Sequence, residues 1–314
     1  MQPLVTVAIP TYNRKKFLKE TLDSIVCQDY SNFEVFISDN HSEDGTDKFV
    51  HQYILEHPYI KIRYYRQDYN KGAELNWKNC YENACGEFII VLSDDDLLER
   101  DALSNLVQAM DDETVFVIGN MNVIDECGMI IGNAMNPIAQ LDSVGFWKRR
   151  LTQGFHDTPS SVMHRTKKIR DIFPIAQRAG SALDLASTLL LSMQGKVKSI
   201  QQIVAEYRVH NGNDSGHLYR CSSSHVSLNK MFEKYTTLDK MQRIWLRKYC
   251  ILQIVEMAFI AFRKERDILL MTRIVNLLNW NNFHFPLFIG WLYYMCFFSK
   301  RGLIKLLKIL RVYH

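Results

Sequence analysis

The sequence predicts an α/β fold, in which helices flank a mostly parallel, doubly wound sheet and a helical region follows. Three observations support this prediction. Strand-like and helix-like segments alternate over residues 4–120, the pattern becomes mixed over residues 114–208, and residues 222–314 have helical character throughout. We therefore expect one domain over residues 1–221, with halves of about 1–120 and 121–221, and a separate helical region over residues 222–314.

Each element has a local signal. Runs rich in β-branched and aromatic residues predict the strands, and apolar residues spaced three and four apart predict the helices. Asp44-Gly45-Thr46 marks a helix start, and Gly195 marks a helix end. The expected strands are residues 5–9, 33–37, 60–65, 88–92, 115–118 and 200–208, and the expected helices are 17–25, 46–54, 73–84, 101–110 and 183–193.

The composition supports a large core and a reducing compartment. Of 314 residues, 47% are hydrophobic and 12% aromatic, which argues against disorder. The seven cysteines are scattered without a CxxC pair, and the N-terminus lacks the pattern of an export signal. We expect reduced thiols in a cytoplasmic protein.

The positive charge is concentrated in the last part of the chain. Residues 263–314 carry nine Lys/Arg against two acidic residues, a net +7 within a total of +4. Phe285–Phe298 is uncharged but shorter than the roughly 20 residues of a spanning helix, and residues 301–311 have a basic amphipathic pattern. We favour peripheral attachment to anionic lipid at the inner face of the cell membrane. The alternative is a helical subdomain that packs on the remaining chain or on a second subunit.

Polar clusters follow three of the predicted strands, where doubly wound sheets bind ligands. They are Thr11-Tyr12-Asn13-Arg14, Ser38-Asp39-Asn40 and Asp94-Asp95-Asp96. Three adjacent carboxylates repel one another unless a cation lies between them, which favours a hard divalent ion and its phosphates. Capping of the helix at 101–110 is the alternative, although one aspartate would suffice for it. The chain contains neither GxGxxG after the first strand nor GxxxxGK[ST], so both common nucleotide fingerprints are unsupported.

Several motifs occur together in a family-specific order. They are Val7-Ala8-Ile9-Pro10-Thr11-Tyr12-Asn13-Arg14, Asp39-Asn40, Asn70-Lys71-Gly72, Leu92-Ser93-Asp94-Asp95-Asp96 and Tyr207-Arg208-Val209-His210. This order resembles glycosyltransferase family 2 over about residues 3–215. The resemblance implies the GT-A (Rossmann-like) fold and inverting sugar transfer from a nucleotide diphosphate, as in bacterial O-antigen and surface-polysaccharide enzymes.

The resemblance also implies a metal site. Asp96 would bind Mn²⁺ or Mg²⁺ directly, with Asp94 nearer the ribose and Asp95 near the donor. Strand alternation would let Asp94 and Asp96 face one site while Asp95 points away, unless the chain turns there. His210 would supply a neutral imidazole to the same ion. The alternative for His210 is a polar residue in a loop after a strand.

The remaining donor contacts follow from the same resemblance. Asp39 would accept a hydrogen bond from the base of a pyrimidine nucleotide of the UDP, CDP or dTDP type, or would only cap a turn. The other residues expected around the nucleotide and sugar are Pro10, Thr11, Tyr12, Arg14, Asn70 and Lys71. Arg14 is also compatible with an ordinary surface role, and Asn-Lys-Gly is by itself a good turn.

The catalytic base of the family usually lies in a Glu-Asp pair at the start of a helix. Here Asp184 matches the aspartate, whereas Leu183 replaces the glutamate, which puts the family's acceptor contacts in doubt. Helix capping is the alternative for Asp184. His156 and Asp157 are candidates for the acceptor side, although a solvated loop is slightly favoured, and Trp147 is expected in the core.

We therefore predict a metal-dependent inverting glycosyltransferase that acts on a lipid-linked oligosaccharide acceptor at the membrane's cytoplasmic face. A metal-dependent nucleotidyltransferase acting on sugar phosphates is the alternative. A non-catalytic membrane or nucleic-acid binder is a weaker third hypothesis, because the first 262 residues carry a net −3 and no nucleic-acid motif occurs.

Overall fold

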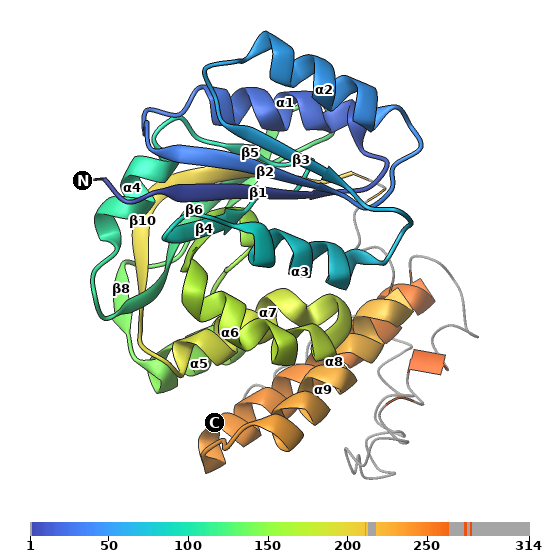
Figure 1. Ribbon diagram of the computed structural model, residues 1–314. Helices are drawn as coiled ribbons and strands as arrows, with labels where there is room; N and C mark the ends of the chain where they lie inside the picture. The colour runs from blue at the N-terminus through green and yellow to red at the C-terminus, as the bar shows by residue number, and fades with distance from the viewer. Residues whose placement is uncertain (1, 211, 213–217, 264–272, 275–276, 278–314) are drawn as a thin grey trace. The chain divides into compact units, whose positions relative to one another are not determined.

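The computed structural model describes residues 2–210, 212, 218–263, 273–274 and 277 (Figure 1). The predicted membrane-binding segments, Phe285–Phe298 and 301–311, lie outside these residues. The strands are β1 (Val5–Thr11), β2 (Phe33–Asp39), β3 (Ile62–Arg66), β4 (Phe88–Val91), β5 (Leu97–Leu98), β6 (Thr114–Ile124), β7 (Ile130–Ala134), β8 (Ala139–Leu141), β9 (Val162–Arg165) and β10 (Lys196–Arg208). The helices are α1 (Lys15–Val26), α2 (Thr46–Glu56), α3 (Ala73–Asn83), α4 (Ala102–Ala109), α5 (Ser143–Thr152), α6 (Thr166–Ala176), α7 (Leu183–Ser192), α8 (Leu218–Tyr235) and α9 (Lys240–Arg263), with short 3₁₀ helices η1 (Pro159–Ser161) and η2 (Gln177–Ala182).

The chain forms two compact units. The first comprises Met1–Phe146, Phe155–Gln177 and Asp184–Asn211, and the second comprises Trp147–Gly154, Arg178–Leu183 and Gly212–His314. This division differs from the predicted boundary after residue 221, because two short segments from the earlier part of the chain pack with α8 and α9. Hydrophobic periodicity within one segment does not reveal such long-range partners.

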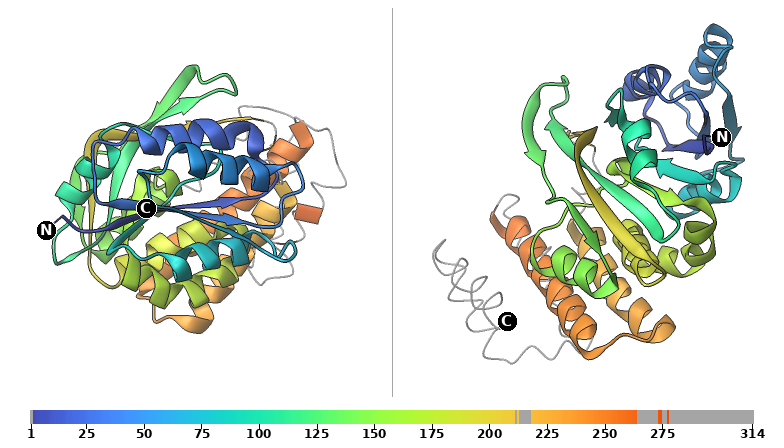
Figure 2. Two further views of the ribbon diagram at one scale, coloured as in Figure 1. Left: turned by 45° about the horizontal axis from the view of Figure 1, so that its top comes forward. Right: turned by 90° about the vertical axis from the view of Figure 1, so that its left-hand side faces the viewer.

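The first unit contains a mixed, mostly parallel sheet, as the alternating pattern predicted. Its strands follow the order β3-β2-β1-β4-β9-β6-β10-β5, with β7 added to β6 and β8 added to β10 (Figure 2). Strands β3, β2, β1 and β4 are parallel to one another, and β6 is parallel to β10. Strand β9 joins the two groups by antiparallel pairing with β4 and β6.

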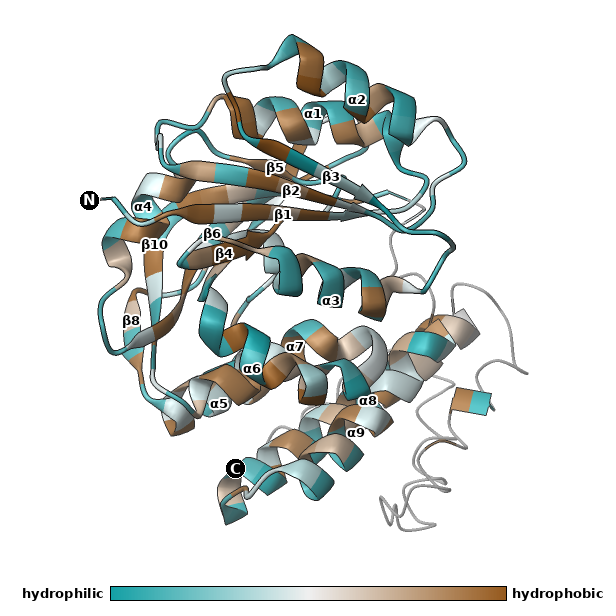
Figure 3. Cartoon of the chain, viewed as in Figure 1, coloured by the Kyte–Doolittle hydropathy of each residue, from teal (hydrophilic) through white to brown (hydrophobic). Residues whose placement is uncertain are grey.

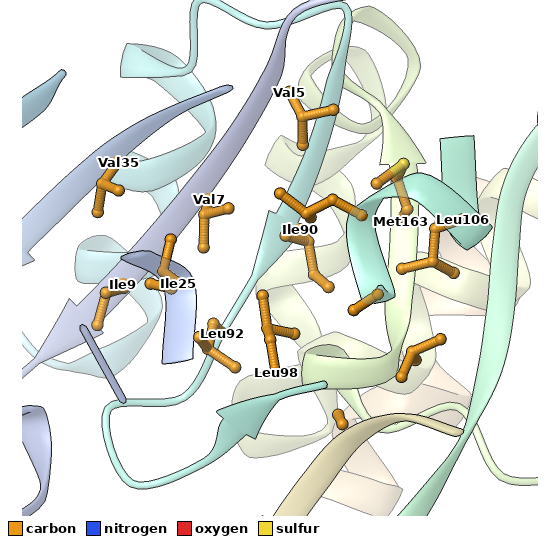
Figure 4. Packing of buried hydrophobic residues seen from close by; sticks show 14 of the residues in the cluster. Val5, Val7, Ile9, Ile25, Val35, Ile90, Leu92, Leu98, Leu106 and Met163 are labelled. Carbon is orange, nitrogen blue, oxygen red and sulfur yellow. The ribbon is translucent and has the colours of Figure 1, made fainter. Parts of the chain in front are cut away.

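The core of the first unit lies on the faces of this sheet. Alternate residues of β1 (Val5, Val7 and Ile9) contribute to one continuous cluster with Ile90 and Met163 (Figure 4). Figure 3 shows apolar colouring concentrated on these central strands, with polar colouring on the outer surfaces of α1 and α2. Burial on both faces explains why the strands have continuous apolar sequences, and it makes the carboxyl edge of the sheet a rigid support.

The second unit is helical where it is described. Trp147 is fully buried, as predicted, and its ring makes an edge contact with Phe232 at 5.0 Å between centroids. The Ser224 hydroxyl accepts a hydrogen bond from the backbone N–H of Ser181 (3.0 Å), which ties the segment 178–183 to α8. In the part of the chain that the structure describes, no helix combines the length and apolar character needed to cross a bilayer.

The buried side chain of His164 should make the free energy of unfolding depend on pH. Its ring is buried in β9, neither ring nitrogen has a hydrogen-bond partner among the described residues, and burial lowers its pKa to about 3. The unfolded chain therefore binds a proton between about pH 6.5 and 3 that the folded chain does not bind, so stability falls as pH decreases through this range. His164→Leu removes this penalty. Its stability gain over wild type should be larger at pH 5 than at pH 7.5 by about 2 kcal/mol, measured by denaturant unfolding. An equal gain at both pH values would contradict this account.

Candidate active site

The three aspartates lie in a turn at the carboxyl end of β4. The strand ends at Val91, and the backbone N–H of Asp96 donates to the carbonyl of Ser93 at 3.2 Å. Because the chain turns here, simple strand alternation does not apply, and the three carboxylates have different surroundings.

Asp95 lies against His210. Its Oδ2 atom is 2.8 Å from His210 Nε2, although the two residues are separated by 115 positions in sequence. Arg14 Nη1 is 2.8 Å from the same ring nitrogen and 3.4 Å from the same carboxylate oxygen. The ring tautomer sets the role of Nε2: without a proton it accepts from Arg14, and with a proton it donates to Asp95. The loops after β1, β4 and β10 thus converge on one point.

Asp96, which the sequence analysis assigned to direct metal binding, is fully buried and has two other partners. Its Oδ2 accepts a hydrogen bond from the Ser160 hydroxyl at 2.5 Å, and its Oδ1 accepts one from the backbone N–H of Arg208 at 2.9 Å. Both oxygens therefore help to hold the aspartate turn against η1 and the end of β10.

The cluster has an excess of negative charge. Burial and the neighbouring Asp95 carboxylate raise the pKa of Asp94 and of Asp96 to about 7 each. These carboxylates accept protons more readily because they are removed from water and lie beside another carboxylate. A divalent cation beside the turn would compensate this negative charge.

Arg208 belongs to the Tyr207-Arg208-Val209-His210 motif, and no role was predicted for it. In the structure it connects several elements of the site. It is 1% exposed, and its Nε donates to the carbonyl of Asp95 at 2.9 Å. Its Nη2 donates to Glu20 Oε2 at 2.7 Å, and the guanidinium lies over the Phe17 ring. Arg208 therefore joins α1 to the aspartate turn and precedes His210 by two residues.

The predicted nucleotide residues gather at the adjacent carboxyl ends of β1 and β2. Asp39 is buried; its Oδ2 accepts from the Tyr64 hydroxyl at 2.6 Å, and its Oδ1 accepts from the Ser42 N–H at 2.8 Å. The turn-capping role weighed from sequence is therefore present. Tyr12 is 43% exposed, which leaves its ring accessible beside the buried Thr11.

Asn70-Lys71-Gly72, the turn predicted to lie beside the sugar donor, is connected to the loop after β2. Asn40 Nδ2 donates to Asn70 Oδ1 at 2.8 Å, and the backbone N–H of Lys71 donates to Asn40 Oδ1 at 2.8 Å. The Lys71 ammonium lies 5.3 Å from the centre of the Tyr69 ring. Asn70-Lys71-Gly72 can therefore be a turn and also lie beside the loop that follows β2.

Asp184 lies in the first turn of α7, where its Oδ1 accepts from the Leu185 N–H at 2.7 Å. Helix α7 immediately precedes β10, so a helix that packs back along the sheet places its first turn toward the carboxyl end of β10. Asp184 is the second residue of the helix and bonds the N–H of the next residue, so it does not occupy the N-cap position weighed from sequence.

One loop connects α7 to the aspartate turn. The Thr188 hydroxyl, one turn after Asp184, donates to Asp157 Oδ2 at 2.6 Å. Three residues after Asp157, Ser160 contacts Asp96. Asp157 is 5% exposed, so the interpretation of this aspartate as a solvated loop residue is wrong. His156 is exposed, and its backbone exchanges hydrogen bonds with the Asn136 side chain.

The side chains of Asp95 and His210 together offer ligand atoms that suit a hard divalent ion. Carboxylate oxygen and neutral imidazole nitrogen are both suitable ligands, and two ligands at right angles on such an ion lie about 3 Å apart, close to the Asp95–His210 separation. The Arg14 guanidinium lies beside both atoms and places positive charge there. Within the described residues, no group of three or more His, Cys, Asp or Glu side chains is arranged to hold a metal. The protein pair would therefore be completed by ligands from the substrate.

Comparison with known proteins identifies the family. The sequence profile of glycosyl transferase family 2 matches residues 6–173, more than half of the chain. The chain belongs to glycosyl transferase family 2. The motifs that suggested this resemblance, from the first strand to the aspartate turn, lie within the matched residues.

Curated relatives include glucosyltransferases named for undecaprenol-linked substrates. GalNAc(5)-diNAcBac-PP-undecaprenol beta-1,3-glucosyltransferase of Campylobacter jejuni is 36% identical over 175 residues, 54% of this chain and 56% of the relative. UDP-Glc:alpha-D-GlcNAc-diphosphoundecaprenol beta-1,3-glucosyltransferase WfgD of Escherichia coli is 28% identical over 135 residues, 43% of this chain and 51% of the relative. The matched segment thus spans about half the length of these relatives.

Solved structures show that the fold is GT-A. TarS residues 1–349 of Staphylococcus aureus, in complex with UDP-GlcNAc, superposes with a TM-score of 0.68 at 15% identity, covering 88% of this chain and 80% of TarS. The mannosyltransferase PcManGT of Pyrobaculum calidifontis, in complex with GDP-Man and Mn²⁺, superposes with a TM-score of 0.62 at 16% identity. The superposition covers 100% of this chain and 85% of PcManGT. The predicted fold class is confirmed.

Proposed function

We propose that this protein is a metal-dependent inverting glycosyltransferase. It moves a sugar from a nucleotide diphosphate to a hydroxyl of a lipid-linked glycan in bacterial surface-polysaccharide or O-antigen synthesis. The observation that supports this function most is the convergence of Asp95, His210 and Arg14 at the carboxyl edge of the sheet. Relatives named for undecaprenol-linked substrates support the acceptor class.

In this proposal Asp95 and His210 hold Mn²⁺ or Mg²⁺, and Asp96 positions the turn through Ser160 and Arg208. This revises the sequence-based assignment of Asp96 as the direct ligand, because both Asp96 oxygens already accept hydrogen bonds from the protein. The ion, when bound, would neutralise charge on the departing diphosphate. Arg14 would donate to the same phosphate oxygens as the leaving group separates.

Asp184 is the proposed base. Inverting transfer is a single displacement, in which the acceptor hydroxyl attacks the anomeric carbon opposite the leaving group and loses its proton. The place of Asp184 in the first turn of α7 lets the helix dipole favour a negative charge there. Asp157 and His156 would lie on the acceptor side of this base.

The proposed donor is a pyrimidine nucleotide sugar of the UDP, CDP or dTDP type. Asp39 supports the UDP and dTDP types, because its buried carboxylate would accept the ring N–H of a uracil or thymine in exchange for the Tyr64 hydroxyl; the ring N3 of cytosine has no hydrogen to donate. Pro10, Thr11 and Tyr12 would line the base and ribose, Asp94 would lie near the ribose, and Asn70 and Lys71 would lie beside the sugar. We further propose a peripheral location at the inner face of the cell membrane, reached through the C-terminal region.

Product analysis tests the proposed function. Purified protein incubated with Mn²⁺, candidate nucleotide sugars and a lipid-linked acceptor should release nucleoside diphosphate and form a glycosylated lipid of inverted anomeric configuration. Asp95→Asn should reduce this release by about 10³, while Asp171→Asn, on the exposed side of α6, should leave it unchanged. Release of pyrophosphate from a nucleoside triphosphate and a sugar phosphate would instead indicate a nucleotidyltransferase and overturn the proposal.

A further inference from the structure

Helix α3 buries polar side chains against the sheet. It packs on β1 and β2 (Figure 1), and its buried residues are Asn76, Cys80 and Tyr81. Asn79, one turn after Asn76, donates from Nδ2 to the Ser38 hydroxyl at 2.8 Å. An amide that is removed from water costs free energy unless its atoms are hydrogen-bonded. The partners of Asn76 therefore indicate what this side chain does in the fold.

The Asn76 amide uses all four of its hydrogen-bonding positions. Its Nδ2 donates to the carbonyl of Ser38 at 3.0 Å and to that of Thr11 at 3.3 Å. Its Oδ1 accepts from the Ser38 hydroxyl at 2.6 Å and from Gln67 Nε2 at 2.9 Å. Because backbone carbonyls only accept, the two carbonyl contacts fix which end of the amide is the nitrogen. One side chain thus joins β1, β2 and the segment after β3.

The Asn76 amide acts where the regular pairing of β1 with β2 stops. The paired register of these strands ends at Thr11 and Asp39. Thr11 directly precedes Tyr12, and Ser38 directly precedes Asp39. The amide therefore holds the backbone immediately before two residues that the proposed function places at the nucleobase.

Gln67 connects the same network to Asp39 from the segment after β3. The Gln67 side chain is 3% exposed and donates to Asn76, and its backbone N–H donates to the Asp39 carbonyl at 2.8 Å. Asp39 is thus held on one side by the bonds of Asn76 to Ser38 and on the other side by Gln67.

We propose that Asn76 is a positioning residue of the nucleotide site, which holds the ends of β1 and β2 at the separation that a nucleobase requires. It acts through Tyr12 and Asp39 and does not contact the nucleotide. This inference rests on the proposed function, because that function places the base at these two loops. An apolar side chain would fill the same space, but it would leave the Ser38 and Thr11 carbonyls without this connection.

The diphosphate end of the proposed site is held independently. Arg14 is held by Asp95 at 3.4 Å and by His210 at 2.8 Å, neither of which belongs to the Asn76 network. Loss of the Asn76 amide should therefore weaken binding of the nucleoside part of the donor and spare binding of the diphosphate part.

Calorimetric binding to the full chain tests the proposal. Asn76→Ala, which suits the interior of a helix, should raise the dissociation constant of UDP with Mn²⁺ about tenfold, the usual cost of weakening one hydrogen bond to a charged group. The dissociation constant of inorganic pyrophosphate with Mn²⁺ should stay within about twofold of wild type. In sugar transfer, KM for the donor should rise about tenfold and kcat should stay within about threefold, because the weakened interaction is equal in the ground and transition states.

Asn120→Ala is the matched control. Asn120 is also fully buried, and its amide donates to the Gln201 carbonyl at 2.8 Å and accepts from the Asn136 N–H at 2.6 Å. It lies on β6, which β4 and β9 separate from β1. Both alanine variants should lose thermal stability, whereas only Asn76→Ala should lose UDP affinity.

A second variant keeps the test decisive. Asn76→Ser retains a hydroxyl that can donate to one carbonyl, so it should show the same selective loss of UDP affinity to a smaller extent. It takes the place of Asn76→Ala if that variant does not fold.

Three outcomes would overturn the proposal: wild-type UDP affinity in the folded Asn76 variant, an equal loss of affinity for pyrophosphate, or an equal loss of UDP affinity in Asn120→Ala. Wild-type protein that binds neither UDP nor dTDP with Mn²⁺ would overturn the proposed donor and this inference together. Nucleotide binding that is the same in wild type and in the Asn76 variant would overturn this inference alone.

Discussion

Replacing Asp184 by asparagine is expected to lower the rate of sugar transfer by about 10²–10⁴, the usual contribution of a positioned general base. Asparagine retains an oxygen that accepts the Leu185 N–H, so the first turn of α7 should be preserved. The amide cannot take a proton from the acceptor hydroxyl. Initial rates at saturating donor, together with calorimetric titration of nucleotide in the presence of Mn²⁺, measure the two effects separately.

The decisive result for the Asp184 variant is a large loss of rate with unchanged nucleotide affinity. Asp171→Asn, on the exposed side of α6, is a matched control and should keep the wild-type rate. Transfer by Asp184→Asn at the wild-type rate would remove the base assignment.

Asp95→Asn and His210→Gln are each expected to reduce transfer by about 10³, because loss of a ligand removes several kcal/mol of charge stabilisation from the leaving diphosphate. Both should also weaken Mn²⁺ binding in the presence of UDP, measured by electron paramagnetic resonance of free Mn²⁺. The effect follows from the 2.8 Å contact between the two side chains at the end of β4 and after β10.

Asp96→Asn distinguishes the two assignments of the metal ligand. Its Oδ atom would still accept one of the hydrogen bonds from Ser160 and Arg208, so Mn²⁺ affinity should fall less than in Asp95→Asn. A larger loss of Mn²⁺ affinity in Asp96→Asn than in Asp95→Asn would restore the assignment made from sequence.

Most of the fold was predictable because it is encoded locally. The parallel strands are continuous apolar runs, and the helices between them have clear periodicity, so β1 to β4 were located within a few residues. The boundary of the helical unit was less predictable. Segments around Trp147 and Ser181 belong with α8 and α9 through contacts between residues far apart in sequence.

The sequence predicted which residues belong to the candidate site. It did not predict which way their side chains point. The aspartates, His210 and Asp184 were selected because they follow strands or begin a helix in a family-specific order. The turn at Ser93–Asp96 decides which carboxylate meets which partner, and strand alternation carries no information about a turn. Asp157 was also misjudged, because a polar loop resembles a solvated one until its burial is known.

By itself the sequence determined the order of elements, the family and the set of charged residues at the carboxyl edge of the sheet, since periodicity and motif spacing are properties of short segments. The tertiary structure alone decided that Asp95 rather than Asp96 lies against His210, and that Arg208 joins α1 to the aspartate turn. These features depend on where distant backbone segments meet, which local patterns do not encode.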